Sequence, residues 1–476
     1  MARVERDSLG EVEVPSEAYY GSFTARAAEN FRISDQGPPR ELIQALADIK
    51  LSAAEVNSEL GYLSERKASA IQSAARELGT GKFDDQFPFG LLQAGAGTPL
   101  HMNVNEVIAN RATEHLGGEK GEYLVHPNDD VNMGQSSNNV IPTAVRLAVV
   151  HLGEGLLGEL NSLEATFKDK ADQYKNQLKV GRTHYRDAVP ITLGQEFHAY
   201  STLCGQGADR IAEALEDLKV IGLGGNAIGT GINTDPSFRD RIAEVLSENS
   251  DLALQPAEDP ISLTQSMEAF HNFANSLRSA VTELDKICDD LMFLSSGPVA
   301  GIAEISLPEV EPGSSIMPGK VNPSIIEAFK MVGLQVKGYA HVISLAAGEG
   351  HLELNVMAPV IGKNLLDGVQ IFSEGLKILR EKCIQGIEVN EGRFERYMKK
   401  STAVATALSP YIGYDRTAEA VHQALEGDRN IRQILLDKGW FREEELDRLL
   451  SPERLTTPRG IDRELKQKVR ERMDER

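Results

Sequence analysis

The sequence predicts a mainly α-helical protein whose centre consists of long helices packed as a bundle. Between Leu263 and Leu291, apolar residues recur at alternating steps of four and three, which is typical of a sustained heptad seam. Similar patterns follow Pro142 and Pro190, and a fourth covers residues 325–347. Several amphipathic helices in succession must bury their apolar stripes on one another, so we expect a bundle.

The two ends of the chain have shorter patterns than the centre. Residues 1–134 mix short helical patterns with joints rich in glycine and proline, and "EVEVP" is the clearest strand-like alternation. The long seams end near Asn390, and turns follow at "SPYIGYD" and "EGDRN". We therefore expect three domains, an N-terminal one over 1–134, a central long-helix domain over 135–391 and a small C-terminal one over 392–476.

Composition excludes several classes of function. The 476 residues are 41% hydrophobic and 25% charged, as in ordinary globular proteins, and the net charge of −21 argues against nucleic-acid or membrane partners. No apolar run approaches the ~18 residues of a membrane span. The charged N-terminus does not resemble a signal peptide, and Cys204, Cys288 and Cys383 are widely separated, so we expect a cytoplasmic protein.

Four polar stretches interrupt the helical patterns: "AGAGTPLHMN", "HPNDDVNMGQSSNN", "GRTHYRDAVP" and "GSSIMPGKVNP". Each has an ordinary structural interpretation, because Ser and Asn cap helices, Gly and Pro form turns, and a single histidine such as His184 is more often structural. "AGAGT" lacks the strand-to-helix context of a nucleotide site. Together, however, the stretches supply hydroxyls, amides, an imidazole and an ammonium, a set that suits a small dicarboxylate.

The stretch "GSSIMPGKVNP" resembles the signature loop of the aspartase/fumarase superfamily. "DSLGEVEVPSEAYYG", "NEVIANRA", "GRTH", "GTGIN" and "LELNV" are similar to further segments of that family, in the same order. The resemblance implies the three-domain aspartase/fumarase fold and a homotetramer around a core of about 20 helices, with active sites shared by three subunits. The seam from Leu263 to Leu291 has more apolar positions than a thin monomeric layer needs, which also favours a tetramer.

The chemistry of this family is a reversible anti elimination from a succinate-type dicarboxylate. A base removes a proton from the carbon next to a carboxylate, and the leaving group departs from the neighbouring carbon of the resulting aci-carboxylate dianion. Preorganised donors must stabilise the accumulating negative charge. The resemblance implies that Ser314 is the base on a mobile loop, that His184 contacts the substrate, and that Glu327 orients His184.

The resemblance also implies a set of binding residues. The expected substrate-binding residues are Thr98, Ser136, Ser137, Asn138, Thr183, Ser315, Lys320 and Asn322. The positions of His126, Asn128 and Asp129 form a secondary anion site in fumarases. Gly313 and Gly319 would let the loop close over substrate and exclude water. No metal-ligand spacing is visible, and no cofactor is expected.

The motifs do not decide which group is eliminated, because some resemble one member of the family and some another. "AGAGT", "RDAVP" and "LELNVMAPVIG" resemble aspartases, which eliminate ammonia from L-aspartate, whereas "HPNDD" and "QSSN" resemble fumarases, which interconvert L-malate and fumarate. Pro99, Leu100 and His101 match neither, because both relatives usually have small polar residues and an Asn there. If Leu100 faced the substrate, the pocket would prefer a less polar substituent. We expect L-aspartate as substrate; the alternatives are L-malate, another substrate of a C–X lyase, or a recruited structural role.

Overall fold

The computed structural model describes residues 2–427 and 429–475, and its chain divides into two compact units. Unit 1 comprises Met1–Glu159, Gly207–Thr282 and Met331–Gly375. Unit 2 comprises Leu160–Gln206, Glu283–Lys330 and Leu376–Arg476. The three-domain division expected from the sequence stays a prediction.

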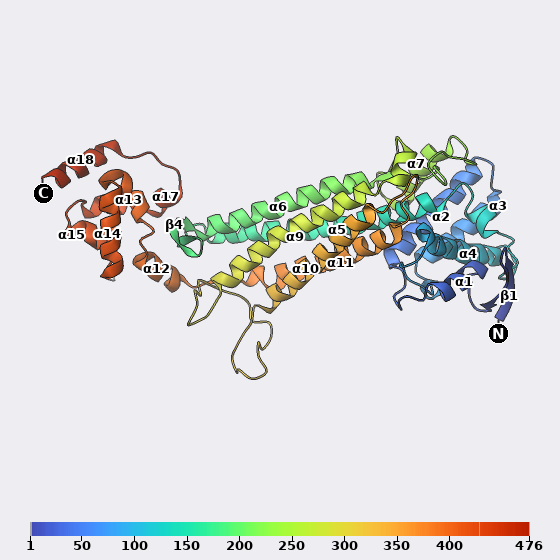
Figure 1. The fold of residues 1–476 in the computed structure, drawn as a ribbon, viewed down its shortest axis with the longest axis horizontal. Helices are drawn as coiled ribbons and strands as arrows, with labels where there is room; N and C mark the ends of the chain where they lie inside the picture. The colour runs from blue at the N-terminus through green and yellow to red at the C-terminus, as the bar shows by residue number, and fades with distance from the viewer. Residues whose placement is uncertain (1, 428, 476) are drawn as a thin grey trace. The chain divides into compact units, whose positions relative to one another are not determined.

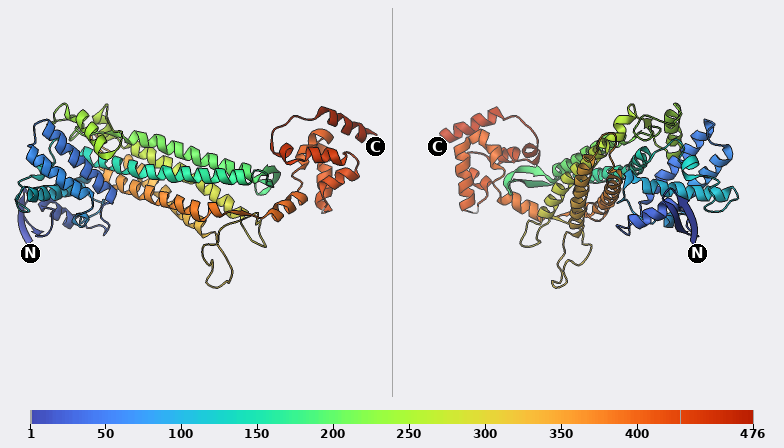
Figure 2. Two further views of the ribbon diagram at one scale, coloured as in Figure 1. Left: turned by 180° about the vertical axis from the view of Figure 1, so that it is seen from behind. Right: turned by 45° about the vertical axis from the view of Figure 1, so that its right-hand side comes forward.

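Long helices contribute to both units. They are α5 (Ser137–Gln173), α6 (Leu193–Leu218), α9 (Glu268–Leu294), α10 (Ser324–Ala347) and α11 (Ala358–Lys382). Within each unit the segments of these helices run side by side, as two views agree (Figure 1, Figure 2). The prediction of a mainly helical fold with long central helices is confirmed. By length and composition α5 alone among the described helices suffices to cross a membrane, but 67% of its apolar window is buried, as in a core helix.

Two of the long helices use their apolar faces differently. The predicted seam is not one continuous helix, because α9 begins only at Glu268 and Leu263 lies before it. The part of the seam on α9 is buried inside the chain, since Phe270, Val281 and Leu291 are at most 1% exposed. The seam therefore leaves no exposed apolar side chains for contact with another subunit, contrary to the expectation from the sequence. The exposed apolar side chains lie on α10 instead, where their spacing places them on one face of the helix. They are Met331, Leu334, Val342 and Leu345.

Short helices and small sheets make up the rest of unit 1. The helices are α1 (Ser22–Asn30), α2 (Arg40–Glu59), α3 (Glu65–Gly79), α4 (Thr98–His115), α7 (Phe238–Ser250) and α8 (Pro260–Gln265), with a 3-10 turn at η1 (Asp84–Gln86). Strands β1 (Ala2–Asp7) and β2 (Gly10–Pro15) form an antiparallel hairpin that contains the predicted "EVEVP". Strands β5 (Val220–Ile221) and β6 (Gln255–Pro256) pair in parallel.

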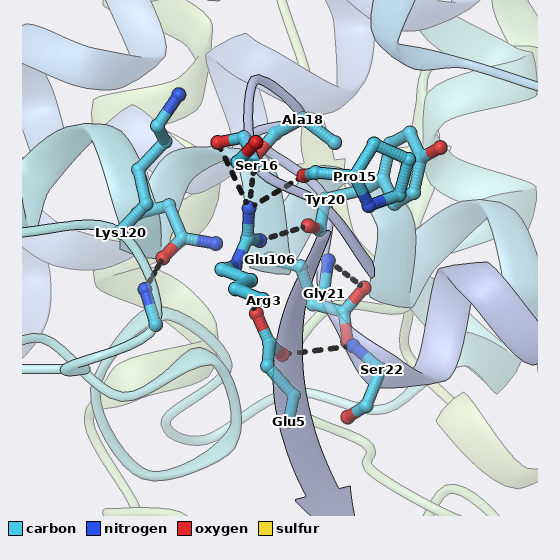
Figure 3. A network of polar contacts seen from close by, with 12 residues as sticks. Arg3, Glu5, Pro15, Ser16, Ala18, Tyr20, Gly21, Ser22, Glu106 and Lys120 are labelled. Atoms are coloured by element: carbon cyan, nitrogen blue, oxygen red, sulfur yellow. Dashed lines mark hydrogen bonds and ion pairs between the residues drawn. The ribbon is translucent and has the colours of Figure 1, made fainter. Parts of the chain in front are cut away.

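A polar network fixes the N-terminal segment against α4. The guanidinium of Arg3 donates to the carbonyl oxygens of Ala18 and Tyr20 at 2.7 and 2.6 Å (Figure 3). Glu106 of α4 is 2% exposed, and its carboxylate accepts N–H groups from Gly21 and Thr24 at 2.9 and 3.1 Å. Burial raises the pKa of Glu106 and these donors oppose the rise. The network anchors the helix that begins at Thr98.

Unit 2 contains the hairpin of β3 (Leu178–Thr183) and β4 (Arg186–Thr192), and the short pair β7 (Ile305–Ser306) and β8 (Glu388–Val389). The C-terminal segment folds into small helices around its own core, in which Leu408, Leu435 and Val469 are fully buried. These helices follow a 3-10 turn, η4 (Ile384–Gly386). They are α12 (Glu391–Lys400), α13 (Ala405–Ile412), α14 (Tyr414–Glu426), α15 (Ile431–Asp437), α16 (Glu443–Leu449), α17 (Pro452–Thr456) and α18 (Arg463–Asp474).

Candidate active site

Thr98 lies at the start of α4, directly after a strained turn. The three residues of η2 (Gly95–Gly97) all have left-handed backbone, with φ of 64° at Gly95, 54° at Ala96 and 88° at Gly97. The left-handed backbone favours glycine at Gly97, and a Cβ there would also lie in tight contact with the Ile141 side chain, at 3.0 Å. The Thr98 hydroxyl donates to the Gly95 carbonyl at 2.6 Å, which leaves its oxygen as an acceptor.

The "QSSNN" stretch forms the N-terminus of α5. The helix begins at Ser137, and Pro142, near which we expected the start, lies inside it. Ser136 acts as a cap, because its Oγ accepts the Asn138 N–H at 3.3 Å. The Asn138 amide nitrogen donates to the Ala227 carbonyl at 2.7 Å, so the Asn138 amide oxygen is left as an acceptor.

The unusual residues after Thr98 face the interior of unit 1. Leu100 is 1% exposed, so it does not face a substrate, and the conditional expectation of a less polar pocket fails. His101 is equally buried; its Nδ1 lies 2.8 Å from Ser137 Oγ and its Nε2 lies 2.6 Å from Nζ of Lys50. Sequence reasoning missed Lys50. The available signal was a lysine among the apolar residues of "ALADIKLSAA".

The Ser314 loop is closed on itself by one backbone and one side-chain hydrogen bond. The Gly313 N–H donates to the Lys320 carbonyl at 2.8 Å, and the side-chain amide nitrogen of Asn322 donates to the Gly313 carbonyl at 2.7 Å. Ser314 Oγ accepts two backbone N–H groups, from Ile316 at 3.2 Å and from Met317 at 3.0 Å. Two N–H dipoles directed at one hydroxyl oxygen favour negative charge on that oxygen.

Thr183 and His184 lie at the tip of the β3–β4 hairpin, where a break between helices was expected. His184 and Tyr185 form the two-residue turn with φ of 53° and 58°. Such turns favour Asn-Gly, because left-handed backbone costs other residues roughly 1–2 kcal/mol each. Below the tip, Arg182 makes a bidentate pair at 2.9 and 2.6 Å with Glu304, which is fully buried. The scaffold therefore holds a strained turn in place, a feature that clusters at functional sites.

The predicted residues fall into two sets. Thr98, Ser136, Ser137 and Asn138 belong to unit 1. Thr183, His184, Ser314, Ser315, Lys320, Asn322 and Glu327 belong to unit 2. Glu327 lies in the first turn of α10 and is exposed, as are His184, Ser315 and Lys320. The orientation of His184 by Glu327 stays a prediction.

The residues expected at a secondary anion site lie around a π-helical turn, η3 (Pro127–Val131). His126 Nδ1 accepts the Asp129 N–H at 3.1 Å and lies 3.3 Å from the Asp129 carboxylate. Asn128 and Asp129 are exposed, and His126 is half-buried. His126 and Asp129 therefore lie together, and whether they bind an anion stays a prediction.

Comparison with known proteins decides the family. Residues 10–338 match the family model described as Lyase, and residues 404–457 match the model described as Fumarase C C-terminus. The chain belongs to the aspartase/fumarase superfamily. It is therefore a lyase of this family, and the resemblance seen in the sequence is confirmed.

The similar proteins include both aspartate ammonia-lyases and class II fumarate hydratases. An aspartate ammonia-lyase of Pseudomonas fluorescens is 45% identical over 96% of this chain and 97% of its own. A class II fumarate hydratase of Thermus thermophilus is 43% identical over 96% and 98%. The crystal structure of a fumarate lyase:delta crystallin from Brucella melitensis bound to cobalt matches with a TM-score of 0.93 and 42% identity, over 96% of this chain and 100% of that one.

Proposed function

We propose that this lyase converts L-aspartate to fumarate and ammonia. The observation that carries the choice is the direction of two hydrogen bonds. The hydrogen of the Thr98 hydroxyl and one of the two hydrogens of the Asn138 amide are engaged by backbone carbonyls at 2.6 and 2.7 Å, and the Thr98 hydroxyl oxygen and the Asn138 amide oxygen remain as acceptors. An ammonium group has only donors and needs acceptors around it. Ser136 caps α5 and Ser137 begins it, and the N-terminal N–H groups of a helix favour an anion.

The proposed reaction starts at Ser314, whose alkoxide is the base. It takes the proton from the carbon next to the distal carboxylate, and the electron pair of the broken C–H bond moves into that carboxylate as an aci-carboxylate. Collapse of this dianion forms the C=C bond, and the C–N bond breaks with its electron pair leaving on nitrogen as ammonia. The N–H groups of Ile316 and Met317 support the alkoxide. Lys320 and Asn322 bind the dianionic carboxylate.

The remaining assigned residues complete the proposal. Thr183 and His184 contact the substrate from the hairpin tip, Ser315 lies beside the base, and Glu327 orients His184. No cofactor takes part, and the enzyme acts in the cytoplasm. The exposed apolar face of α10 supports a homotetramer, since an unpaired stripe of this kind is typical of a helix with a partner.

Assembly has a direct test. We expect a particle of four times the 52.0 kDa chain in light scattering. Mixing inactive Ser314→Ala and His184→Ala proteins after subunit exchange should restore part of the activity, because three subunits share each active site. Leu334→Glu should break the assembly. A fully active monomer would contradict the tetramer.

Activity is tested by measuring fumarate formation at 240 nm from L-aspartate and from L-malate side by side. Thr98→Val removes the acceptor and should lower kcat/KM for aspartate by about tenfold or more, whereas Thr98→Ser should retain it. The similar identity of the fumarate hydratase relative makes L-malate the second candidate. Turnover of malate ten times faster than aspartate would establish that alternative.

A further inference from the structure

A buried polar chain runs behind Ser137 in unit 1. Lys50 is fully buried on α2, and its Nζ lies 2.6 Å from His101 Nε2, 2.8 Å from Gln135 Oε1 and 3.1 Å from Asn132 Oδ1. The opposite nitrogen of His101, Nδ1, lies 2.8 Å from Ser137 Oγ. One imidazole therefore joins a buried amine to a hydroxyl of the proposed substrate site.

The two amides around Lys50 have a fixed orientation. The Asn132 nitrogen donates to the Gln135 carbonyl at 3.2 Å, and the Gln135 side-chain nitrogen donates to the carbonyls of Val131 and Met133 at 3.1 and 3.2 Å. Both amide oxygens must therefore face Lys50. A charged ammonium has three N–H groups, which match these two oxygens and one imidazole nitrogen.

The charge of Lys50 sets the direction of the hydrogen bonds that link Lys50, His101 and Ser137. When Lys50 is charged, His101 Nε2 accepts, the proton of His101 lies on Nδ1, and Nδ1–H donates to Ser137 Oγ. The Ser137 proton is then free for a ligand. When Lys50 is neutral, its lone pair accepts from Nε2–H, Nδ1 accepts the Ser137 proton, and that proton is withdrawn from any ligand.

An anionic ligand would select the first arrangement. Burial lowers the pKa of Lys50 well below its usual value, and burial together with the Lys50 charge lowers the pKa of His101. None of the three hydrogen-bond partners of Lys50 is a carboxylate. A carboxylate arriving at Ser137 would supply the missing negative charge, and Coulomb attraction is strong where water is excluded.

We propose that Lys50 and His101 are positioning residues that turn the Ser137 hydroxyl into a hydrogen-bond donor for a substrate carboxylate and place a buried positive charge behind it. This inference rests on the proposed function, because it names the group that Ser137 recognises. The proposed substrate site in unit 1 then offers a donor at Ser137 and acceptors at Thr98 and Asn138. These groups match the carboxylate and the ammonium of an α-amino acid. His101, part of the segment that departs from both relatives, acquires a physical role as the bridge.

The test uses succinate, a dicarboxylate that cannot undergo the elimination, in isothermal titration calorimetry on the full-length protein. Lys50→Met, His101→Phe and Ser137→Ala should each weaken succinate binding by at least about tenfold. For the wild-type reaction they should raise KM more than they lower kcat. His101→Gln should recover much of the affinity, because its amide accepts from Lys50 and donates to Ser137. Lys82→Met, at an exposed lysine of unit 1, is the matched control and should bind normally.

Double variants separate this inference from mere damage to the fold. Lys50→Met combined with Ser137→Ala should lose less affinity than the two single losses predict together, since Lys50 acts in part through the Ser137 hydroxyl. Circular dichroism on each variant checks folding, and the comparison of His101→Phe with His101→Gln decides the matter if Lys50→Met does not fold. Additive losses, or His101→Phe binding succinate like the wild type, would overturn the inference.

The two proposals fail in different ways. A wild-type protein that binds succinate with the expected His101 dependence, but releases no ammonia from L-aspartate, would overturn the proposed function and support a carboxylate at Ser137. A wild-type protein that releases ammonia, with His101→Phe unchanged in KM, would overturn this inference and support the proposed function.

Discussion

Ser137 and Ser314 are both serines of the proposed site, but their hydroxyl oxygens are held by different means. Ser137 Oγ meets the side chain of the buried His101 at 2.8 Å, whereas Ser314 Oγ meets the backbone N–H groups of Ile316 and Met317 on an exposed loop. An imidazole offers either a donor or an acceptor. A pair of backbone N–H groups offers donors only, and so favours a charged oxygen.

The difference teaches how one residue type is suited to two tasks. A binding serine must keep its proton and direct it, which a buried network of fixed donors and acceptors achieves. A basic serine must lose its proton, which requires donors that cannot take the role of acceptor. The buried region should therefore respond to substitution in stability and affinity, and the exposed loop in turnover.

The largest expected effect is at Ser314. Ser314→Ala should lower turnover by about three orders of magnitude or more and leave succinate binding largely intact, because the side chain acts on the reacting proton. Its thermal midpoint should match the wild type, since the loop is exposed. Stopped-flow or steady-state assays at 240 nm measure the turnover. Near-normal turnover would show that another group is the base.

Gly313→Ala should have the next largest effect. A Cβ there would lie 2.7 Å from the Asn322 backbone nitrogen and 2.8 Å from the Lys320 carbonyl oxygen, so the closed loop must open. We expect kcat to fall by about 10- to 100-fold while the midpoint of thermal unfolding stays the same. Gly319→Ala tests conformation alone, because nothing lies within 4 Å of its Cβ but its φ is 79°. Equal activity of Gly313→Ala and the wild type would contradict a closed loop as the working geometry.

Leu100→Thr should affect stability and spare substrate choice. The side chain is 1% exposed, so the substitution buries a hydroxyl in place of methyl groups. We expect the free energy of unfolding to fall by about 1–3 kcal/mol, measured by urea denaturation, with the ratio of kcat/KM for aspartate and malate unchanged. Leu100→Met keeps the volume and serves as the control. A changed ratio in Leu100→Thr would restore the idea that this position faces the substrate.

Substitution of Asp48 should change how the stability of the protein depends on pH. Burial raises the pKa of this carboxyl from 3.8 to about 7, so the folded protein holds a proton that the unfolded chain releases. The carboxyl therefore costs stability progressively as pH rises from about 4 to about 7. Asp48→Asn should raise the free energy of unfolding by about 2–4 kcal/mol at pH 8 and by much less at pH 4. A gain that does not vary with pH would mean that Asp48 is charged in the folded protein.

The sequence by itself determined the helical class, the family and the identity of the chemical groups. The heptad seam on α9 requires a helical partner whatever the topology, and "GSSIMPGKVNP" places hydroxyl, ammonium and amide on one continuous loop, so their grouping is independent of tertiary contacts. Ser136 as a helix cap was likewise readable, because capping depends on residues only two apart.

Tertiary structure alone decided which way each group faces. The α9 seam is used inside the chain and α10 carries the exposed stripe, a distinction that depends on which helices pack together rather than on either pattern. Leu100 is buried and His101 bridges to Lys50, which lies 51 positions earlier in the chain. Hydrogen-bond direction at Thr98, Asn138 and Ser137 is set by carbonyl and imidazole partners that no local pattern specifies. A sequence names donors and acceptors, and only packing assigns them to one another.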